Sequence, residues 1–367
     1  MTAIIHLVLT NFRNLARWEH EALPEVGVVV LVGPNGVGKT SVLEALSLLD
    51  GSRGLVGDDA KEMVKVGCER EGWAVFMDYR MTGDRLQEGS LGLQYRGGQR
   101  QVVVDGVEGK VEDLAGRVCV VSLVPELDRV FYESPSGRRA LLDAWAGMVV
   151  AGHGEAVDRY TQHSKNRLRI LMQGGAADWL EAEEYQAAVW GVKVLAGRKG
   201  YLEGLQGHLE GLKLELGGAA QEVLVAADPV AALKGKLERS REIDTRLERT
   251  SAGPNTVDVV AQLRITGLQD DRLRDGAAPR EEWVVAKQSS SGQHKRVMLR
   301  WLGGQVRAVM ATGIVPLVLV DELGAHLDAA GKAEAVEMLV GLGVQAWVSD
   351  VAMEVRDGVQ IIGMETA

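Results

Sequence analysis

Residues 33–41 read Gly33-Pro34-Asn35-Gly36-Val37-Gly38-Lys39-Thr40-Ser41. The stretch follows an apolar, β-branched run at 28–32, which predicts a buried strand, and precedes 42–49, whose apolar spacing predicts a helix. A strand, a glycine-rich loop and a helix in this order form the context of a phosphate-binding loop, in which backbone N–H groups and the helix N-terminus point at phosphate oxygens. The alternative is an ordinary glycine turn in a chain with 45 glycines, but a Lys-Thr pair at this spacing favours the phosphate loop.

Two kinds of side chain complete the expected nucleotide site. Lys39 can reach the β- and γ-phosphates, and the Thr40 hydroxyl can ligate Mg²⁺. A later apolar strand at 315–320 ends in Asp321, which can hold Mg²⁺ directly or through water, and Glu322, which can activate or orient the attacking water. Because many strands end in acidic residues, this pair indicates a nucleotide site only in combination with the phosphate loop. We therefore expect an ATPase with ATP and Mg²⁺ as cofactors, catalytic Lys39 and Glu322, and metal ligands Thr40 and Asp321.

A third element, residues 289–296, places three serines and a glycine at the start of a helix expected from about 291 to 310. Small hydroxyl residues at a helix N-terminus favour an anion site. The alternative is a plain N-cap, for which serine is a preferred residue. The position of the segment just before the acidic strand favours the anion site.

Composition and charge exclude several classes of protein. The net charge of −10 argues against binding nucleic acid with the whole surface, although a local basic face remains possible. No apolar run approaches the roughly 18 residues of a membrane span, and the first residues do not resemble a signal peptide. Two cysteines cannot build a disulfide framework. We expect a cytoplasmic protein with no membrane partner.

The order of predicted elements indicates one sheet built from both ends of the chain. Strands are expected at 3–10, 25–32, 73–80, 91–95, 101–105 and 117–124, and again at 257–260, 262–266, 283–287, 315–320, 344–349 and 359–362. Helices are expected from 136, across most of 154–248, and at 330–342. The expected domains are an ATPase head from 1–150 and 249–367, and a helical lobe at 151–248.

Two stripes run along the expected helix near 200. Leucines recur at 202, 205, 209 and 212, and glycines at 197, 200, 204, 207 and 211. Each glycine costs a helix roughly 1 kcal/mol relative to alanine. The row of glycines fits either the close approach of a second helix or a weak, broken helix.

The three nucleotide-site elements together resemble the ABC-type ATPases. Residues 290–293 are similar to their signature motif, and Leu327-Asp328 resembles their D-loop. In that family, the signature of one subunit caps the γ-phosphate bound by the other, which implies an ATP-dependent head-to-tail homodimer. The resemblance implies that a partner's site is completed in trans by Ser290, Ser291, Gly292, Gln293 and Asp328. It implies that each chain's own nucleotide contacts come from Arg13, Asn35, Gly36, Val37, Gly38, Lys39, Thr40 and Ser41.

Motif spacing distinguishes the branches of the ABC-type ATPases. Lys39 and Gly292 lie 253 residues apart, farther than is usual in transporter subunits, while SMC-type coiled coils are too long to fit. Four further stretches are Leu9-Thr10-Asn11-Phe12-Arg13-Asn14-Leu15, Pro125-Glu126-Leu127, Arg138-Arg139-Ala140-Leu141-Leu142-Asp143 and Lys165-Asn166-Arg167-Leu168. With these stretches, the chain resembles the RecF family.

This resemblance implies an α/β fold: an ABC-type ATPase head with a mixed sheet and P-loop core, an antiparallel β subdomain and an inserted helical lobe. It also implies a DNA-repair ATPase that dimerises with ATP, binds double-stranded DNA at gaps or junctions without sequence preference, and hydrolyses ATP weakly under DNA stimulation. The same resemblance implies that the protein acts with a RecR-like mediator to promote RecA loading. The alternative function is the ATPase subunit of a membrane transporter or other ABC complex.

Two departures from the family pattern bear on function. The family often has Gly-Pro-His-Arg-Asp-Asp where residues 253–258 here read Gly-Pro-Asn-Thr-Val-Asp, so any role of the basic and histidine positions is in doubt. Transporter ATPases place a histidine after their last core strand, where this chain has Ser349-Asp350. RecF proteins commonly lack that histidine, and no γ-phosphate sensor is assigned there.

Basic residues gather at the start of the helical block. Phosphate contacts with DNA are expected from Arg138, Arg139, Lys165, Arg167 and Arg169. Spacing alone favours an ordinary solvated helix face. The RecF resemblance instead favours a face that contacts DNA.

Overall fold

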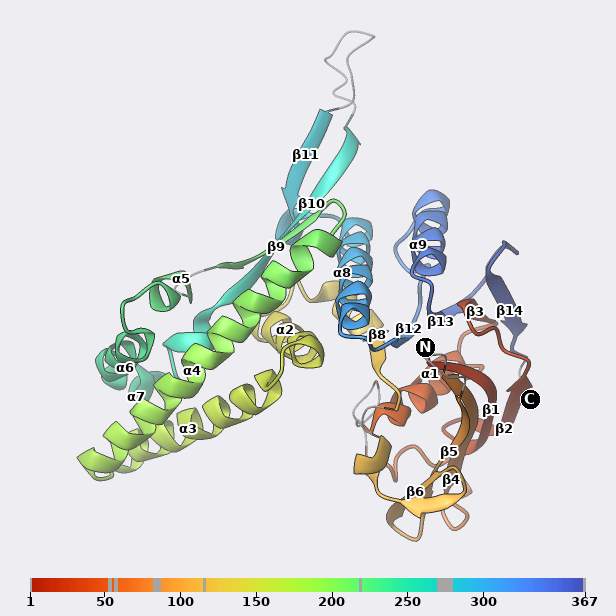
Figure 1. Cartoon of the computed structure of the whole chain (residues 1–367), viewed down its shortest axis with the longest axis horizontal. Helices are drawn as coiled ribbons and strands as arrows, with labels where there is room; N and C mark the ends of the chain where they lie inside the picture. Colours follow the sequence, from red (N-terminus) through yellow and green to blue (C-terminus); the bar gives the residue numbers. More distant parts are fainter. Residues whose placement is uncertain are drawn as a thin grey trace. The chain divides into compact units, whose positions relative to one another are not determined.

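The computed structural model describes residues 2–51, 55, 59–81, 87–114, 117–217, 220–268 and 280–365 (Figure 1). The chain divides into two compact units, of which the first contains residues 1–128 and 298–367 and the second contains 129–297. The sequence pattern suggested boundaries near 150 and 249 instead. In the structure, helix α2 (Pro135–Val149) and strand β10 (Asp258–Leu268) belong to the second unit.

A five-stranded parallel sheet forms the centre of the first unit, in the order β14-β3-β13-β12-β8. Its strands come from both ends of the chain, as the sequence predicts: β3 (Gly27–Val32), β8 (Val120–Leu123), β12 (Leu317–Val320), β13 (Gln345–Asp350) and β14 (Val359–Gly363). The apolar residues of β3, β12 and β13 are almost all buried. Strands buried on both faces of a parallel sheet read as continuous apolar runs, which is why this sheet could be predicted.

A six-stranded antiparallel sheet forms the rest of the first unit, in the order β2-β1-β4-β5-β6-β7. Its strands are β1 (Thr2–Phe12), β2 (Leu15–Glu21), β4 (Trp73–Met81), β5 (Gln87–Arg96), β6 (Gln99–Val104) and β7 (Val107–Gly109). Strands β2 and β7 were not predicted from the sequence. Strand β2 lies at an edge and carries mostly charged and polar residues, which hide its strand character.

Helix α1 (Lys39–Ser47) lies in a hydrophobic core that draws on both sheets. Three short 3₁₀ helices and helix α9 (Ala329–Gly341) complete the first unit, the former at Leu48–Asp50, Val111–Leu114 and Pro125–Arg129. The two sheets are joined by the fully buried Gln345, whose side-chain amide bonds the N–H of Ile4 at 2.9 Å and the carbonyls of Ile4 and Pro24 at 2.8 and 2.7 Å. These bonds satisfy backbone groups that would be costly to bury unpaired.

The second unit is a helical hairpin with smaller helices and a three-stranded sheet. Helices α3 (His153–Gln173) and α4 (Ala177–Leu205) run side by side after a turn at Gly174 (Figure 1). The sheet has the order β11-β10-β9, with β9 at Leu212–Gly217 and β11 at Arg280–Val285. The remaining elements are α5 (Ala220–Leu224), α6 (Pro229–Arg239), α7 (Arg241–Leu247) and 3₁₀ turns at Gln206–His208, Gly253–Thr256 and Ala286–Gln288. Helix α8 (Ser291–Ala311) begins here and ends in the first unit.

The helix expected to carry leucines 202 to 212 ends earlier, at Leu205, so that part of the prediction was wrong. Gly211 adopts a positive φ of 62° and the chain then enters β9, where Leu212 and Leu214 are buried and Lys213 and Glu215 are exposed. This alternation with period two is the strand signal that the longer leucine spacing concealed.

The row of glycines has no single explanation. A Cβ atom added at Gly197 would lie 2.3 Å from the His153 ring of α3, so a close helix approach accounts for that position. Among the described residues, none from another element comes within 4 Å of a Cβ added at Gly200 or Gly204, and Gly207 and Gly211 lie beyond the end of α4.

Across the described residues, we find no helix with both the length and the apolar character needed to cross a membrane.

Candidate nucleotide-binding site

The loop between β3 and α1 has the backbone of a phosphate-binding loop. Gly36 and Gly38 adopt positive φ angles of 81° and 110°, a region that glycine enters without strain. A Cβ atom at Gly38 would lie 2.6 Å from Leu15 Cδ2, so this position also leaves no room for a side chain. Helix α1 begins directly after Gly38 and points its N-terminus into the loop.

Lys39 lies inside this loop. Its side chain is largely buried, and the ammonium group donates hydrogen bonds to the carbonyls of Gly33 at 2.7 Å and Pro34 at 2.9 Å. The positive charge is therefore held at the mouth of the loop, next to the helix N-terminus, where a phosphate group would be stabilised.

The acids that follow β12 lie beside the loop. Thr40 Oγ1 donates to Asp321 Oδ2 at 2.9 Å, and Ser349 Oγ donates to Asp321 Oδ1. The N–H of Glu322 donates to Ser349 Oγ at 2.8 Å, while the Glu322 side chain is exposed. The structure thus brings together Lys39 and the acidic pair, which are far apart in sequence, and it adds Ser349, to which the sequence analysis gave no role.

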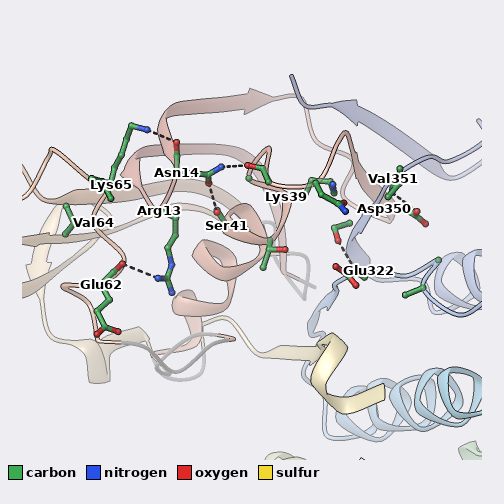
Figure 2. A pocket seen from close by; sticks show the side chains of 18 residues that line it. Arg13, Asn14, Lys39, Ser41, Glu62, Val64, Lys65, Glu322, Asp350 and Val351 are labelled. Carbon is green, nitrogen blue, oxygen red and sulfur yellow. Dashed lines mark hydrogen bonds between the residues drawn. The ribbon is translucent and has the colours of Figure 1, made fainter. Parts of the chain in front are cut away.

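Lys39, Thr40, Glu322 and Ser349 line a cavity of about 970 Å³ (Figure 2). Its described lining comes entirely from the first unit: Arg13, Asn14, Asn35, Gly36, Gly38, Lys39, Thr40, Ser41, Glu62, Val64, Lys65, Val66, Glu322, Gly324, Ala325, Ser349, Asp350 and Val351. The volume suits a nucleotide-sized ligand. Of the expected cis contacts, only Val37 is absent from the lining, and its side chain is buried.

Asn14 is a site residue that the sequence analysis missed. Its side chain donates to the Gly36 carbonyl at 2.7 Å and accepts from Ser41 Oγ at 2.8 Å, which ties the turn after β1 to both ends of the phosphate loop (Figure 2). The neighbouring Arg13 bonds Glu44 of α1, with Nε at 2.7 Å from Oε2, and the Glu62 carbonyl at 3.1 Å. The signal lay in the opening stretch 9–15, of which only Arg13 was assigned a role.

The expected trans residues have local roles in this chain. Ser290 and Gln293 form a capping box: the N–H of Ser290 donates to Gln293 Oε1 at 2.8 Å, and the N–H of Gln293 donates to Ser290 Oγ at 3.3 Å. Ser291 and Gly292 begin helix α8. Asp328 caps α9 by accepting from the Gly331 N–H at 2.8 Å. In the single chain, residues 290–293 therefore act as an N-cap. This role is compatible with a second role at a partner's site.

The five cations expected to contact DNA do not share one environment. Arg138 is buried and pairs with Asp258 at 2.7 and 2.8 Å. Burial would raise the pKa of Asp258, but its hydrogen bonds and charge interaction with Arg138 outweigh that effect and lower it. Arg139 is half-buried against the Val257 carbonyl, and burial lowers its pKa. Asp258 is the last residue of the segment 253–258, and its pairing with Arg138 is structural.

Arg167 is fully buried and joins four helices. It donates to Glu184 of α4 at 3.1 Å, to Asp244 of α7 at 2.6 Å, and to the Leu237 carbonyl of α6 at 2.6 Å. An arginine with all these partners holds the helices together and does not offer its charge to DNA. Of the expected set, Lys165 and Arg169 are the exposed cations.

We expect Arg167→Met to lower the free energy of unfolding by about 3–5 kcal/mol, because the change leaves the buried Asp244 carboxylate without its cation and leaves Glu184 with only the more exposed Arg241. Urea denaturation followed by circular dichroism measures the effect. Arg169→Ala, two residues along the same helix but exposed, should change it by less than about 0.5 kcal/mol. Equal stability of the two variants would contradict the structural role of Arg167.

Comparison with known proteins supports the nucleotide site and shows the family. The family model described as "AAA domain, putative AbiEii toxin, Type IV TA system" matches residues 28–84, which include the phosphate loop. The "DNA replication and repair protein RecF" of Mesorhizobium japonicum is 30% identical over 354 residues, covering 95% of this chain and 91% of the relative. The protein of the same name from Brucella suis biovar 1 is 29% identical over 366 residues, covering 95% and 89%.

A solved structure supports the fold. The "Structure of the recombination mediator protein RecF-ATPrS in RecFOR pathway" matches with a TM-score of 0.77 and 23% identity, over 100% of this chain and 96% of that one. The predicted α/β, ABC-type ATPase head is thereby confirmed, and the transporter alternative is not supported. The chain is an ABC-type, P-loop ATPase, and it belongs to the RecF family of DNA replication and repair proteins.

Proposed function

We propose that this ATPase closes into a head-to-tail homodimer on binding ATP, holds double-stranded DNA at gaps or junctions without sequence preference, and reopens on hydrolysis. DNA stimulates a weak ATPase activity, and a RecR-like mediator uses the closed dimer to promote RecA loading. One observation carries the proposal: Lys39, Thr40 and Glu322 line one cavity, and Thr40 bonds Asp321 at 2.9 Å. The solved relative is described as a recombination mediator protein in the RecFOR pathway, which supports the role in repair.

The Thr40 hydroxyl and the Asp321 carboxylate fit a magnesium ion. Both offer hard oxygen ligands, and Thr40 Oγ1 lies 2.9 Å from Asp321 Oδ2. Adjacent ligands of an octahedral Mg²⁺ with Mg–O distances of 2.0–2.1 Å are also about 2.9 Å apart. When bound, Mg²⁺ would neutralise phosphate charge that develops during phosphoryl transfer.

Glu322 is placed to orient a water molecule. Its backbone is held by Ser349, and its exposed side chain lines the cavity. A carboxylate in hydrogen-bond reach of the attacking water can accept its proton.

Completion of the site requires a second copy in this proposal. Helix N-termini bind anions, and α8 starts with the small residues Ser291 and Gly292. We place this N-terminus against the γ-phosphate held by the partner. Closure would then depend on ATP, because the phosphate forms part of the interface.

We expect the exposed pair Lys165 and Arg169, four residues apart on α3, to contact DNA phosphates. Lys165→Ala/Arg169→Ala should lower the slope of log K against log salt by about 1.8, or about 0.9 for each lost contact. Fluorescence anisotropy of a labelled duplex with ATP and the Glu322→Gln protein, titrated across NaCl concentrations, measures the slope.

Lys234→Ala/Lys236→Ala is the matched control. It removes the same charge from α6, where Lys234 already pairs with Glu181 at 2.8 Å and Lys236 with Glu222 at 2.7 Å. The slope should stay near that of the parent protein. If both double variants lowered it equally, net charge alone would explain the binding, and the α3 contact would be refuted.

A further inference from the structure

Ser349 occupies a position in the sheet that gives it access to both acids of the nucleotide site. It lies near the end of β13, which runs parallel to β12 with Val348 opposite Val320. Asp321 follows Val320 directly, so Ser349 and Asp321 leave the same edge of the sheet side by side. Ser349 is fully buried.

Three hydrogen bonds connect Ser349 to the segment after β12. Its hydroxyl donates to Asp321 Oδ1 and accepts from the N–H of Glu322 at 2.8 Å. Its carbonyl accepts from the N–H of Leu323 at 3.1 Å. One residue thus holds the carboxylate of the first acid and the backbone of the second.

These hydrogen bonds determine how the carboxylates of Asp321 and Glu322 are oriented. With Oδ1 of Asp321 engaged by Ser349, Oδ2 is the oxygen that faces Thr40, at 2.9 Å. Glu322 has a φ angle of 51°, a left-handed conformation that side-chain-bearing residues rarely adopt. The bond from its N–H to Ser349 Oγ helps to hold this backbone, and with it the direction in which the Glu322 carboxylate leaves the chain.

We propose that Ser349 is a positioning residue of the ATPase: its hydroxyl orients Asp321 towards the metal ion and fixes Glu322 for the attacking water. The inference rests on the metal and water roles given to these acids in the proposed function. It concerns a residue that lies outside both the phosphate loop and the acidic pair in sequence, because the serine comes from a different strand.

The test uses Ser349→Ala in a Glu322→Gln background, which removes the hydroxyl while hydrolysis is suppressed. A fluorescent ATP analogue is titrated with Mg²⁺ and with EDTA, and Mn²⁺ binding in the presence of ATP is followed by electron paramagnetic resonance. Loss of a group that orients a metal ligand typically costs 10- to 100-fold in metal affinity. We expect Mn²⁺ affinity to fall by about 10-fold or more, and nucleotide affinity in EDTA to change by less than about 2-fold because the phosphate loop is unchanged.

Activity supplies a second readout with wild-type Glu322. Ser349→Ala should lower kcat by about 10-fold or more and raise the Mg²⁺ concentration for half-maximal activity. Ser122→Ala is the matched control, since Ser122 lies on β8, the other neighbour of β12, opposite Leu319. It should leave both the metal affinity and kcat near wild type.

Two results would overturn the inference: wild-type Mn²⁺ affinity in Ser349→Ala, or an equal loss of nucleotide affinity with and without metal, which would indicate general damage. A parent protein that binds nucleotide but shows no metal-dependent binding or hydrolysis would refute the proposed function itself. The two failures are therefore distinguishable.

Discussion

Lys39→Ala is expected to weaken ATP binding by about 100-fold or more. The Lys39 ammonium lies in the phosphate loop against the Gly33 and Pro34 carbonyls, and its charge is the one best placed to meet the β- and γ-phosphates. Two hydrogen bonds to charged phosphates contribute about 1.5–3 kcal/mol each, and each 1.4 kcal/mol is a factor of ten in affinity, so losing both costs about 100-fold or more. Isothermal titration calorimetry with ATP and Mg²⁺ measures the loss.

Lys61→Ala provides the control for this variant. Lys61 is an exposed lysine in the same unit and does not line the cavity. Its removal should change ATP affinity by less than about 2-fold, in line with other surface substitutions. Tight ATP binding by Lys39→Ala with an unchanged fold would contradict the assignment of the cavity as the nucleotide site.

Glu322→Gln is expected to slow hydrolysis by about 10²- to 10⁴-fold while ATP still binds. The amide keeps the size of the side chain but cannot accept a proton, and general-base catalysis contributes a factor of this order. Single-turnover phosphate release measures the chemical step, and a fluorescent ATP analogue measures binding. Since ATP persists, light scattering should detect an ATP-dependent dimer that accumulates in this variant.

Glu62→Gln tests whether any carboxylate near the nucleotide has this effect. Glu62 lines the same cavity, and its carbonyl accepts a hydrogen bond from Arg13, away from Glu322 (Figure 2). Hydrolysis should stay within about 2-fold of the parent. Comparable loss in both variants, or normal hydrolysis in Glu322→Gln, would remove Glu322 from its role.

The nucleotide site was largely predictable because its parts are local in sequence. The glycine loop, its strand and its helix are contiguous, and Asp321 and Glu322 directly follow an apolar strand. The missing members reach the site from elsewhere in the fold: Asn14 from the turn after β1, and Ser349 from β13. Which residues of β12 and β13 lie side by side depends on sheet register, and a single sequence does not reveal it.

The helical unit was less predictable for a related reason. Arg167 looked like part of a basic face, because its partners Glu184 and Asp244 lie 17 and 77 residues away and only the packing of α3, α4 and α7 brings them to it. Near 212, a leucine spacing typical of helices and an alternation typical of strands coincide. Pairing with β10 decided in favour of the strand, which is a tertiary effect.

Substitutions of Ser290 test whether a second copy completes each site. They have to distinguish loss of the cap of helix α8 from loss of the proposed contact with the partner's phosphate. Ser290→Ala and Ser290→Arg both lose the hydrogen bond to the Gln293 N–H, which lowers the free energy of unfolding by about 0.5–2 kcal/mol. Only arginine adds bulk where a partner's phosphate would approach. We therefore expect ATP-dependent dimers for Ser290→Ala and monomers for Ser290→Arg, with ATP bound in both.

The most direct test mixes Lys39→Ala with Ser290→Arg in equal amounts and measures ATP hydrolysis. Neither protein alone forms a working site. In a head-to-tail dimer, the intact loop of one variant meets the intact serine of the other, so random pairing restores about a quarter of the wild-type sites. We predict activity approaching that level in the mixture. A mixture as inactive as its separate components, with both proteins folded, would contradict the shared site.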